Sequence, residues 1–165
     1  MADVKSLRDL FVQNLRRIYD AEKRVVKALP KMRDAATSDE LKHAFQTHFE
    51  ETEAHCDRLD QIFEWFDEKP RPQTCEAVKG IVKDGEYVLD LDAEAAVKDA
   101  ALIAAAQEAE HFEIASYGTL RTWATVLGNT EAMQVLEVTL EEEKNADALL
   151  TNIAGTLNLR AAHAD

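Results

Sequence analysis

Apolar residues recur three or four positions apart along almost the whole chain, which is the spacing of one face of an α-helix. Leu7, Leu15 and Leu29 belong to one such stripe near the N-terminus. Glycine and proline, with 5 and 3 copies in 165 residues, offer few positions at which a helix is interrupted. We therefore expect an all-α protein with long helices over residues 4–36, 39–67, 93–127 and 130–157.

Interruptions of the stripe mark where these helices begin and end. The segment 37–40, Thr-Ser-Asp-Glu, has the pattern of a capping box, with the Thr37 side chain capping the second helix. The Lys-Pro-Arg-Pro segment at 69–72 ends that helix, and Asp92 is expected to cap the next long one. Pro30 lies inside the first helix and is expected to kink or break it.

The lengths of the connections predict how the helices are arranged. The first and last connections are short, and in the last one Gly128 ends a helix before Asn129 or Thr130 caps the next. The middle connection is long and contains a shorter predicted helix at 75–88. Short connections make antiparallel neighbours, and one long crossover is typical of the ferritin-like four-helix bundle. We expect such a bundle as a single domain over residues 1–165.

The charge of the chain excludes some partners. The net charge is −13 and the pI is about 4.8, so neither nucleic acid nor an anionic membrane surface is expected to bind. No apolar run approaches the roughly 18–20 residues of a membrane span. Cys56 and Cys75 form no C-x-x-C motif and are expected to be reduced thiols. With a charged, periodic N-terminal segment unlike a signal peptide, this predicts a cytoplasmic protein.

Several acidic residues lie inside the apolar stripes, where a lone buried carboxylate is unfavourable unless it is paired or protonated. A cation shared by several carboxylates removes this difficulty, because the ion supplies the opposite charge. In the second predicted helix, His48, Glu51 and His55 follow one another at intervals of one turn beside the apolar line. The acidic residues inside the other stripes are Glu22, Glu110, Glu113 and Glu143.

The distances of these residues from the turns place them at similar heights in the bundle. At about 1.5 Å per residue, the carboxylates on both helices of each hairpin lie roughly 20–24 Å from the connecting turn. Glu110 lies one turn farther, about 4–5 Å. All four helices therefore present a carboxylate in one layer, which two metal ions about 3.5–4 Å apart would span.

Ordinary structural roles compete with this interpretation. For Glu22 and for Glu51, an ion pair at a helix edge is as good an explanation as metal binding. His55 is expected at the boundary of the core rather than among the ligands. The sequence leaves Glu142 and Glu143 as alternatives. A faint internal repeat aligns Glu51 with Glu142, whereas the apolar stripe favours Glu143.

Five segments resemble a known family: YDAEK (19–23), HFEET (48–52), DAALIAAAQ (99–107), EHFEIASYGTL (110–120) and LEEEK (140–144). Together they are similar to the YciE/YciF family of bacterial ferritin-like proteins, over nearly the whole chain. The resemblance implies a cytoplasmic, stress-associated protein with a ferritin-like bundle that is usually a dimer. Ferritin-like relatives bind two iron or manganese ions and handle oxygen, peroxide or ferrous iron.

The chain departs from the usual ferritin-like ligand pattern, which has Glu-x-x-His on two helices. Ala54 follows Glu51 at the third position, and Asn145 follows Glu142. We therefore expect a site with more oxygen and fewer nitrogen donors, which favours hard cations such as Mn²⁺ or Fe³⁺, with Fe²⁺ still possible.

The sequence supports three hypotheses about function. The first is a centre of two iron or manganese ions with ferroxidase or peroxide-consuming activity, near Tyr19 and Tyr117. The second is a non-catalytic metal-binding or structural stress protein, and the third is a metal-free dimeric interaction module. The candidate metal ligands are Glu22, His48, Glu51, Glu110, Glu113, Glu142 and Glu143.

Overall fold

The computed structural model describes residues 4–163, so the first three and last two residues of the expected domain lie outside the described part. Residues 4–163 contain helices and no strand, which confirms the all-α prediction. The helices are α1 (Leu7–Ala35), α2 (Asp39–Trp65), α3 (Glu76–Leu89), α4 (Ala95–Val126) and α5 (Thr130–Ala161).

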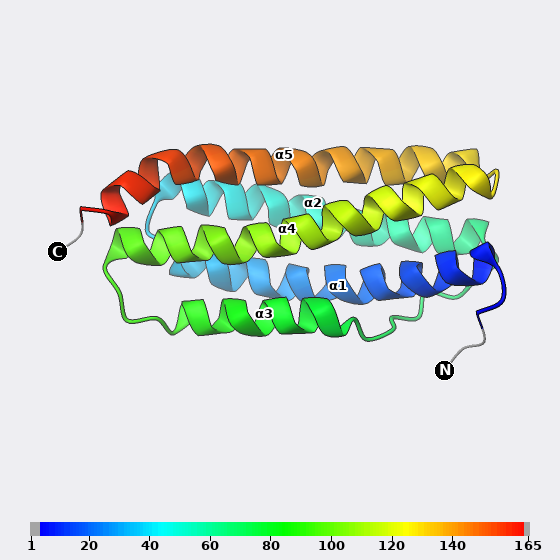
Figure 1. Ribbon diagram of the computed structural model, residues 1–165, viewed down its shortest axis with the longest axis horizontal. Coiled ribbons are helices and arrows are strands. Elements are labelled where there is room, and N and C mark those ends of the chain that lie inside the picture. Colours follow the sequence, from blue (N-terminus) through cyan, green and yellow to red (C-terminus); the bar gives the residue numbers. More distant parts are fainter. Residues whose placement is uncertain (1–3, 164–165) are drawn as a thin grey trace.

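The four long helices lie side by side, and the short helix lies outside them (Figure 1). Helices α1 and α2 form one antiparallel hairpin, and α4 and α5 form the other. The long crossover between the hairpins contains α3, which packs against α1 and α4. The expected bundle with one long crossover is therefore present.

The cap of α2 differs from the prediction. Ser38, not Thr37, is the N-cap, and its side chain accepts a hydrogen bond from the backbone N–H of Leu41. The Thr37 hydroxyl instead donates to Asp99 of α4, at 2.7 Å. Asp99 also accepts from the backbone N–H groups of Thr37 and Ser38, at 2.8 and 2.9 Å. Asp99 of another helix therefore binds the hydroxyl that was expected to cap α2, and the local cap moves one residue on to Ser38.

Other helix ends are partly as predicted. Asn129 caps α5 by accepting from the backbone of Ala132, and Gly128, at a φ of 75°, ends the preceding turn as expected. The prediction for Asp92 was wrong, because the N-cap of α4 is Glu94, whose side chain makes no capping hydrogen bond. Helix α5 also extends past residue 157 to Ala161.

Helix α1 continues unbroken through Pro30, so the predicted break is absent. Pro30 is half-buried, and its neighbours Leu29 and Met32 are buried in the core. The packing of this face outweighs the loss of one backbone hydrogen bond at the proline.

The apolar core is divided into two clusters. One contains Phe11, Leu15 and Phe63 near the start of α1, and the other contains Leu29 and Phe45 near its end. On each long helix, a segment that contains buried polar or charged side chains separates the fully buried apolar residues of the two clusters. The bundle therefore has a polar layer across its middle, enclosed by apolar packing at both ends.

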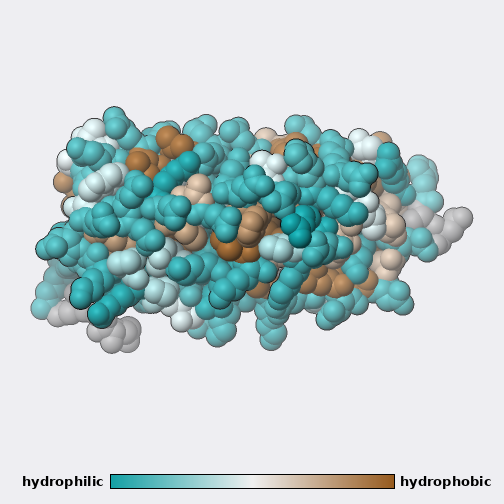
Figure 2. Space-filling view, turned by 180° about the vertical axis from the view of Figure 1, so that it is seen from behind, coloured by the Kyte–Doolittle hydropathy of each residue, from teal (hydrophilic) through white to brown (hydrophobic). Residues whose placement is uncertain are grey.

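The outer surface is mainly hydrophilic on the face that Figure 2 shows, with small separate hydrophobic patches. No helix within residues 4–163 combines the length and the apolar character needed to cross a membrane.

Candidate metal centre

The polar layer is built from buried side chains of all four long helices. On α2, His48 and His55 are seven residues apart and therefore lie on one face of the helix. On α4, Glu110 and Glu113 are three residues apart and also lie on one face. All of the inward-facing residues are at most 5% exposed. They are Glu22 of α1, His48 and His55 of α2, Glu110 and Glu113 of α4, and Glu143 of α5.

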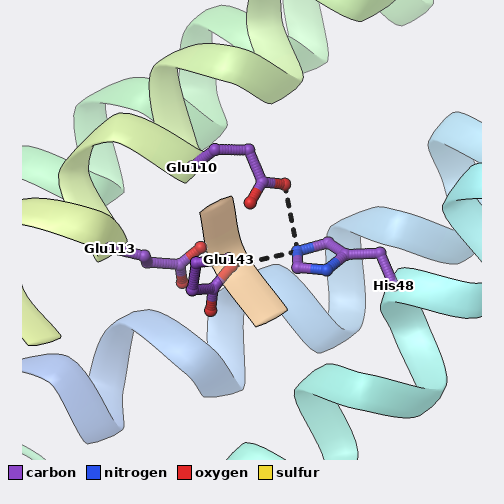
Figure 3. A group of neighbouring side chains, drawn as sticks. All are labelled: His48, Glu110, Glu113 and Glu143. Carbon is purple, nitrogen blue, oxygen red and sulfur yellow. Dashed lines mark ion pairs between the residues drawn. The ribbon is translucent and has the colours of Figure 1, made fainter. Parts of the chain in front are cut away.

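One half of the layer consists of His48, Glu110, Glu113 and Glu143, which point toward a common space (Figure 3). The His48 Nε2 atom lies 3.0 Å from Glu110 Oε1 and 3.8 Å from Glu143 Oε2. One ligand atom from each of the four residues lies within 4.8 Å of the others. This is the spacing expected of donors to one metal ion.

The other half consists of Glu22, His55 and Glu143, which meet the same distance criterion. The His55 Nδ1 atom lies 3.1 Å from Glu143 Oε1 and 3.5 Å from Glu22 Oε1. The Tyr117 hydroxyl donates a hydrogen bond to Glu22. Because Glu143 belongs to both groups, the layer offers two adjacent positions with one shared carboxylate.

The carboxylates of this layer lack the hydrogen-bond donors that buried oxygens normally have. Within the described residues, neither oxygen of Glu113 has a hydrogen-bond partner, and Glu22 and Glu110 each have one oxygen without a partner. Among the same residues, the oxygens of Glu143 have only ring nitrogens near them as possible donors, His55 Nδ1 at 3.1 Å and His48 Nε2 at 3.8 Å. A bound cation would satisfy all of these atoms, so the residues fit a metal site.

Burial and mutual repulsion change the acidity of the same groups. Burial, together with the nearby Glu22, raises the pKa of Glu143 to about 8. Burial, together with the nearby carboxylates of Glu22 and Glu143, raises the pKa of Glu113 well above its ordinary value. For His55, burial acts against protonation, but Glu143 and Glu22 outweigh it and raise the pKa to about 10. Without a cation, protons therefore balance the charge of the layer, and metal binding would displace them.

Each histidine has a second carboxylate behind it. The His55 Nε2 atom lies 2.9 Å from Glu142, so its Nδ1 atom is the one that faces the layer. The His48 Nδ1 atom lies 3.6 Å from Glu51, so its Nε2 atom faces inward. Metal-binding histidines typically have such a carboxylate on the other ring nitrogen, which fixes the orientation of the ring.

Glu142 and Glu51 thus lie at the edge of the layer rather than inside it. Their side chains are 26% and 35% exposed. Arg58 also donates hydrogen bonds to Glu142, and although burial acts in the opposite direction, Arg58 and His55 lower the pKa of that carboxyl. Glu142 is therefore a charged partner of Arg58 and His55.

Of the seven residues predicted as ligands, five come together in the layer: Glu22, His48, Glu110, Glu113 and Glu143. The prediction that His55 lies at the core boundary was wrong, because it is fully buried in the layer. Its interval of seven residues from His48 was the available signal. Both imidazoles face the layer together with four carboxylates, so the layer offers two nitrogen donors, whereas fewer nitrogen ligands were expected.

The fold and this layer define the class of protein: a ferritin-like helix bundle with a buried group of histidines and glutamates that is compatible with metal binding. The chain belongs to the family described as Domain of unknown function (DUF892), which matches residues 6–163. It is 42% identical over 153 residues to Protein YciF of Escherichia coli strain K12, covering 92% of each chain. The predicted resemblance to the YciE/YciF family is confirmed.

Solved structures agree with this assignment. The E. coli stress protein YciF matches with a TM-score of 0.90 and 41% identity, covering 93% of this chain and 98% of that one. YcfI of Rhodopseudomonas palustris, named as a candidate structural protein, matches with a TM-score of 0.87 and 41% identity, covering 91% and 96%. Ferritin-like, diiron-carboxylate proteins of Bacillus anthracis match with a TM-score of 0.70 and 15% identity, covering 92% and 99%. These neighbours confirm the ferritin-like fold.

Proposed function

We propose that the buried layer binds two iron or manganese ions and that the protein reacts with oxygen or peroxide. The observation that carries this proposal is the pair of adjacent donor groups that share Glu143, with carboxylate oxygens left without hydrogen-bond donors. One position would be held by His48, Glu110, Glu113 and Glu143. The other would be held by Glu22, His55 and Glu143.

Two bound ions of these metals would supply redox chemistry toward oxygen or peroxide. The surrounding residues hold the donors in place: Glu142 lies within hydrogen-bond distance of His55, Glu51 lies 3.6 Å from His48, and Tyr117 donates to Glu22. The apolar clusters on both sides limit access of water to the layer.

A non-catalytic metal-binding role is the second candidate. It is favoured by the description of the similar YcfI as a candidate structural protein. In that case bound metal would stabilise the folded chain by mass action, without turnover.

Metal analysis and activity assays on two variants separate these functions. Glu143→Ala removes the shared carboxylate, and Glu141→Ala is the matched control, because the neighbouring Glu141 is exposed and pairs with Lys144 on the surface. We expect about two metal ions per wild-type chain, and loss of both metal and aerobic Fe²⁺ oxidation or peroxide consumption in Glu143→Ala only. Bound metal without turnover would favour the second candidate. Absence of metal even after reconstitution would overturn both.

A further inference from the structure

A cleft of about 430 Å³ lies between α1, α3 and α4, on the side of the bundle that the crossover covers. This volume is within the usual range for small-molecule sites, which are lined mainly by apolar side chains. The main apolar lining residues are Val25, Leu29 and Met32 of α1 and Ile81, Val82 and Leu89 of α3. The cleft therefore suits the apolar part of a ligand.

Four basic residues of α1 line the same cleft, although the chain as a whole has a net charge of −13. Three of them have partners: Arg24 pairs with Asp20, Lys31 pairs with Glu86, and Lys23 lies over the Tyr19 ring. Lys27 is exposed, and although its charge acts on Asp20 of the same cleft, it makes no hydrogen bond or ion pair with any other residue in the range 4–163. It is therefore available to an anionic group.

The cleft also reaches the polar layer. Glu110, which is 2% exposed, lines the cleft, and its Oε2 atom has no hydrogen-bond donor among the described residues. Glu110 would repel a negatively charged group of the ligand at this end of the cleft. The single negative charge of the ligand is therefore expected at Lys27. Small side chains from α4, Ala105 and Ala109, leave room for a slender chain beside Glu110.

We propose that this cleft binds a linear, mostly apolar monocarboxylate of the medium-chain fatty acid class. Its carboxylate lies at Lys27, and its hydrocarbon chain lies between α1, α3 and α4. This binding needs no metal, so it is independent of the function proposed for the polar layer.

The test is calorimetric titration of the metal-free, full-length protein with decanoate below its micellar concentration. Each buried methylene contributes about four-fold in affinity, so octanoate, which is two methylenes shorter, is expected to bind about 15-fold more weakly. Decyltrimethylammonium, which has the same chain and the opposite charge, is expected not to bind.

Variants locate the site. Lys27→Glu is expected to weaken decanoate binding at least ten-fold, whereas Lys83→Glu is the control, because Lys83 is exposed on α3 and outside the cleft lining. Ala109→Leu fills the cleft and is expected to abolish binding. Ala104→Leu is the matched control on the exposed face of α4.

Circular dichroism melting shows whether Ala109→Leu is folded, and Ala28→Leu, which fills the cleft from α1, replaces it if it is not. Three outcomes would overturn the proposal: no binding of decanoate, unchanged binding in both Lys27→Glu and the cleft-filling variant, or equal binding of the cationic amphiphile.

Discussion

Replacing Glu113 with glutamine is expected to stabilise the metal-free protein, although the residue is completely buried. The folded state raises the pKa of Glu113 well above the value of 4.5 that it has in the unfolded chain. The folded protein therefore holds a proton that the unfolded chain releases, and its stability falls as the pH rises above about 4.5. Each pH unit changes the free energy of unfolding by about 1.4 kcal/mol per proton.

At pH 8 this protonation destabilises the folded state by up to about 5 kcal/mol, since 8 is roughly 3.5 units above 4.5. Glutamine has nearly the same shape and needs no proton. We expect metal-free Glu113→Gln to be more stable than wild type at pH 8, by at most about 5 kcal/mol, and by less than about 1 kcal/mol at pH 5.

Urea denaturation of chelator-treated protein at both pH values measures this difference. The control is Glu108→Gln, because Glu108 is an exposed acidic residue of the same helix. With metal present the order should reverse, because wild type gains stability by binding the ion and the variant loses a ligand. Equal stability of Glu113→Gln and wild type at both pH values would refute the reasoning.

Two further substitutions test contacts away from the shared carboxylate. Asp99→Ala removes three hydrogen bonds to the start of α2 and is expected to lower the free energy of unfolding by about 2–4 kcal/mol in urea denaturation. A loss no larger than that of the exposed control Asp92→Ala would contradict this role. Tyr117→Phe removes the donor to Glu22 and is expected to weaken metal affinity about ten-fold or more in a competition titration, whereas Tyr87→Phe, on the surface, is not. Equal affinities of the two tyrosine variants would contradict this.

The sequence predicts the helices well because their signal is local. Each apolar stripe depends only on residues a few positions apart, and the predicted range 39–67 differs little from the observed Asp39–Trp65. The cap at Thr37 was mispredicted because its partner, Asp99, is distant in sequence. Pro30 was mispredicted because tertiary packing of the surrounding face maintains the helix.

The sequence predicts the height of the candidate site along the bundle, but not how each helix is rotated about its own axis. Counting residues from each turn places carboxylates of four helices in one layer, and Glu22 and Glu113 do lie there in two adjacent groups that share Glu143. The rotation of each helix about its axis decides which of two adjacent residues faces inward, so sequence alone left Glu142 and Glu143 as alternatives. The role of each residue as a metal ligand stays a prediction.

Helix α3 contributes only one fully buried residue, Val78, and none of the residues of the polar layer. A segment with so few buried residues is expected to open locally at a lower free energy than the four long helices of the bundle. Such opening would expose the wall of the cleft, up to Glu110 at its inner end, while the four long helices stayed packed. A molecule bound in the cleft could then exchange when α3 opens locally, whereas release of a bound metal ion would need the long helices to separate. The two processes would occur on separate time scales.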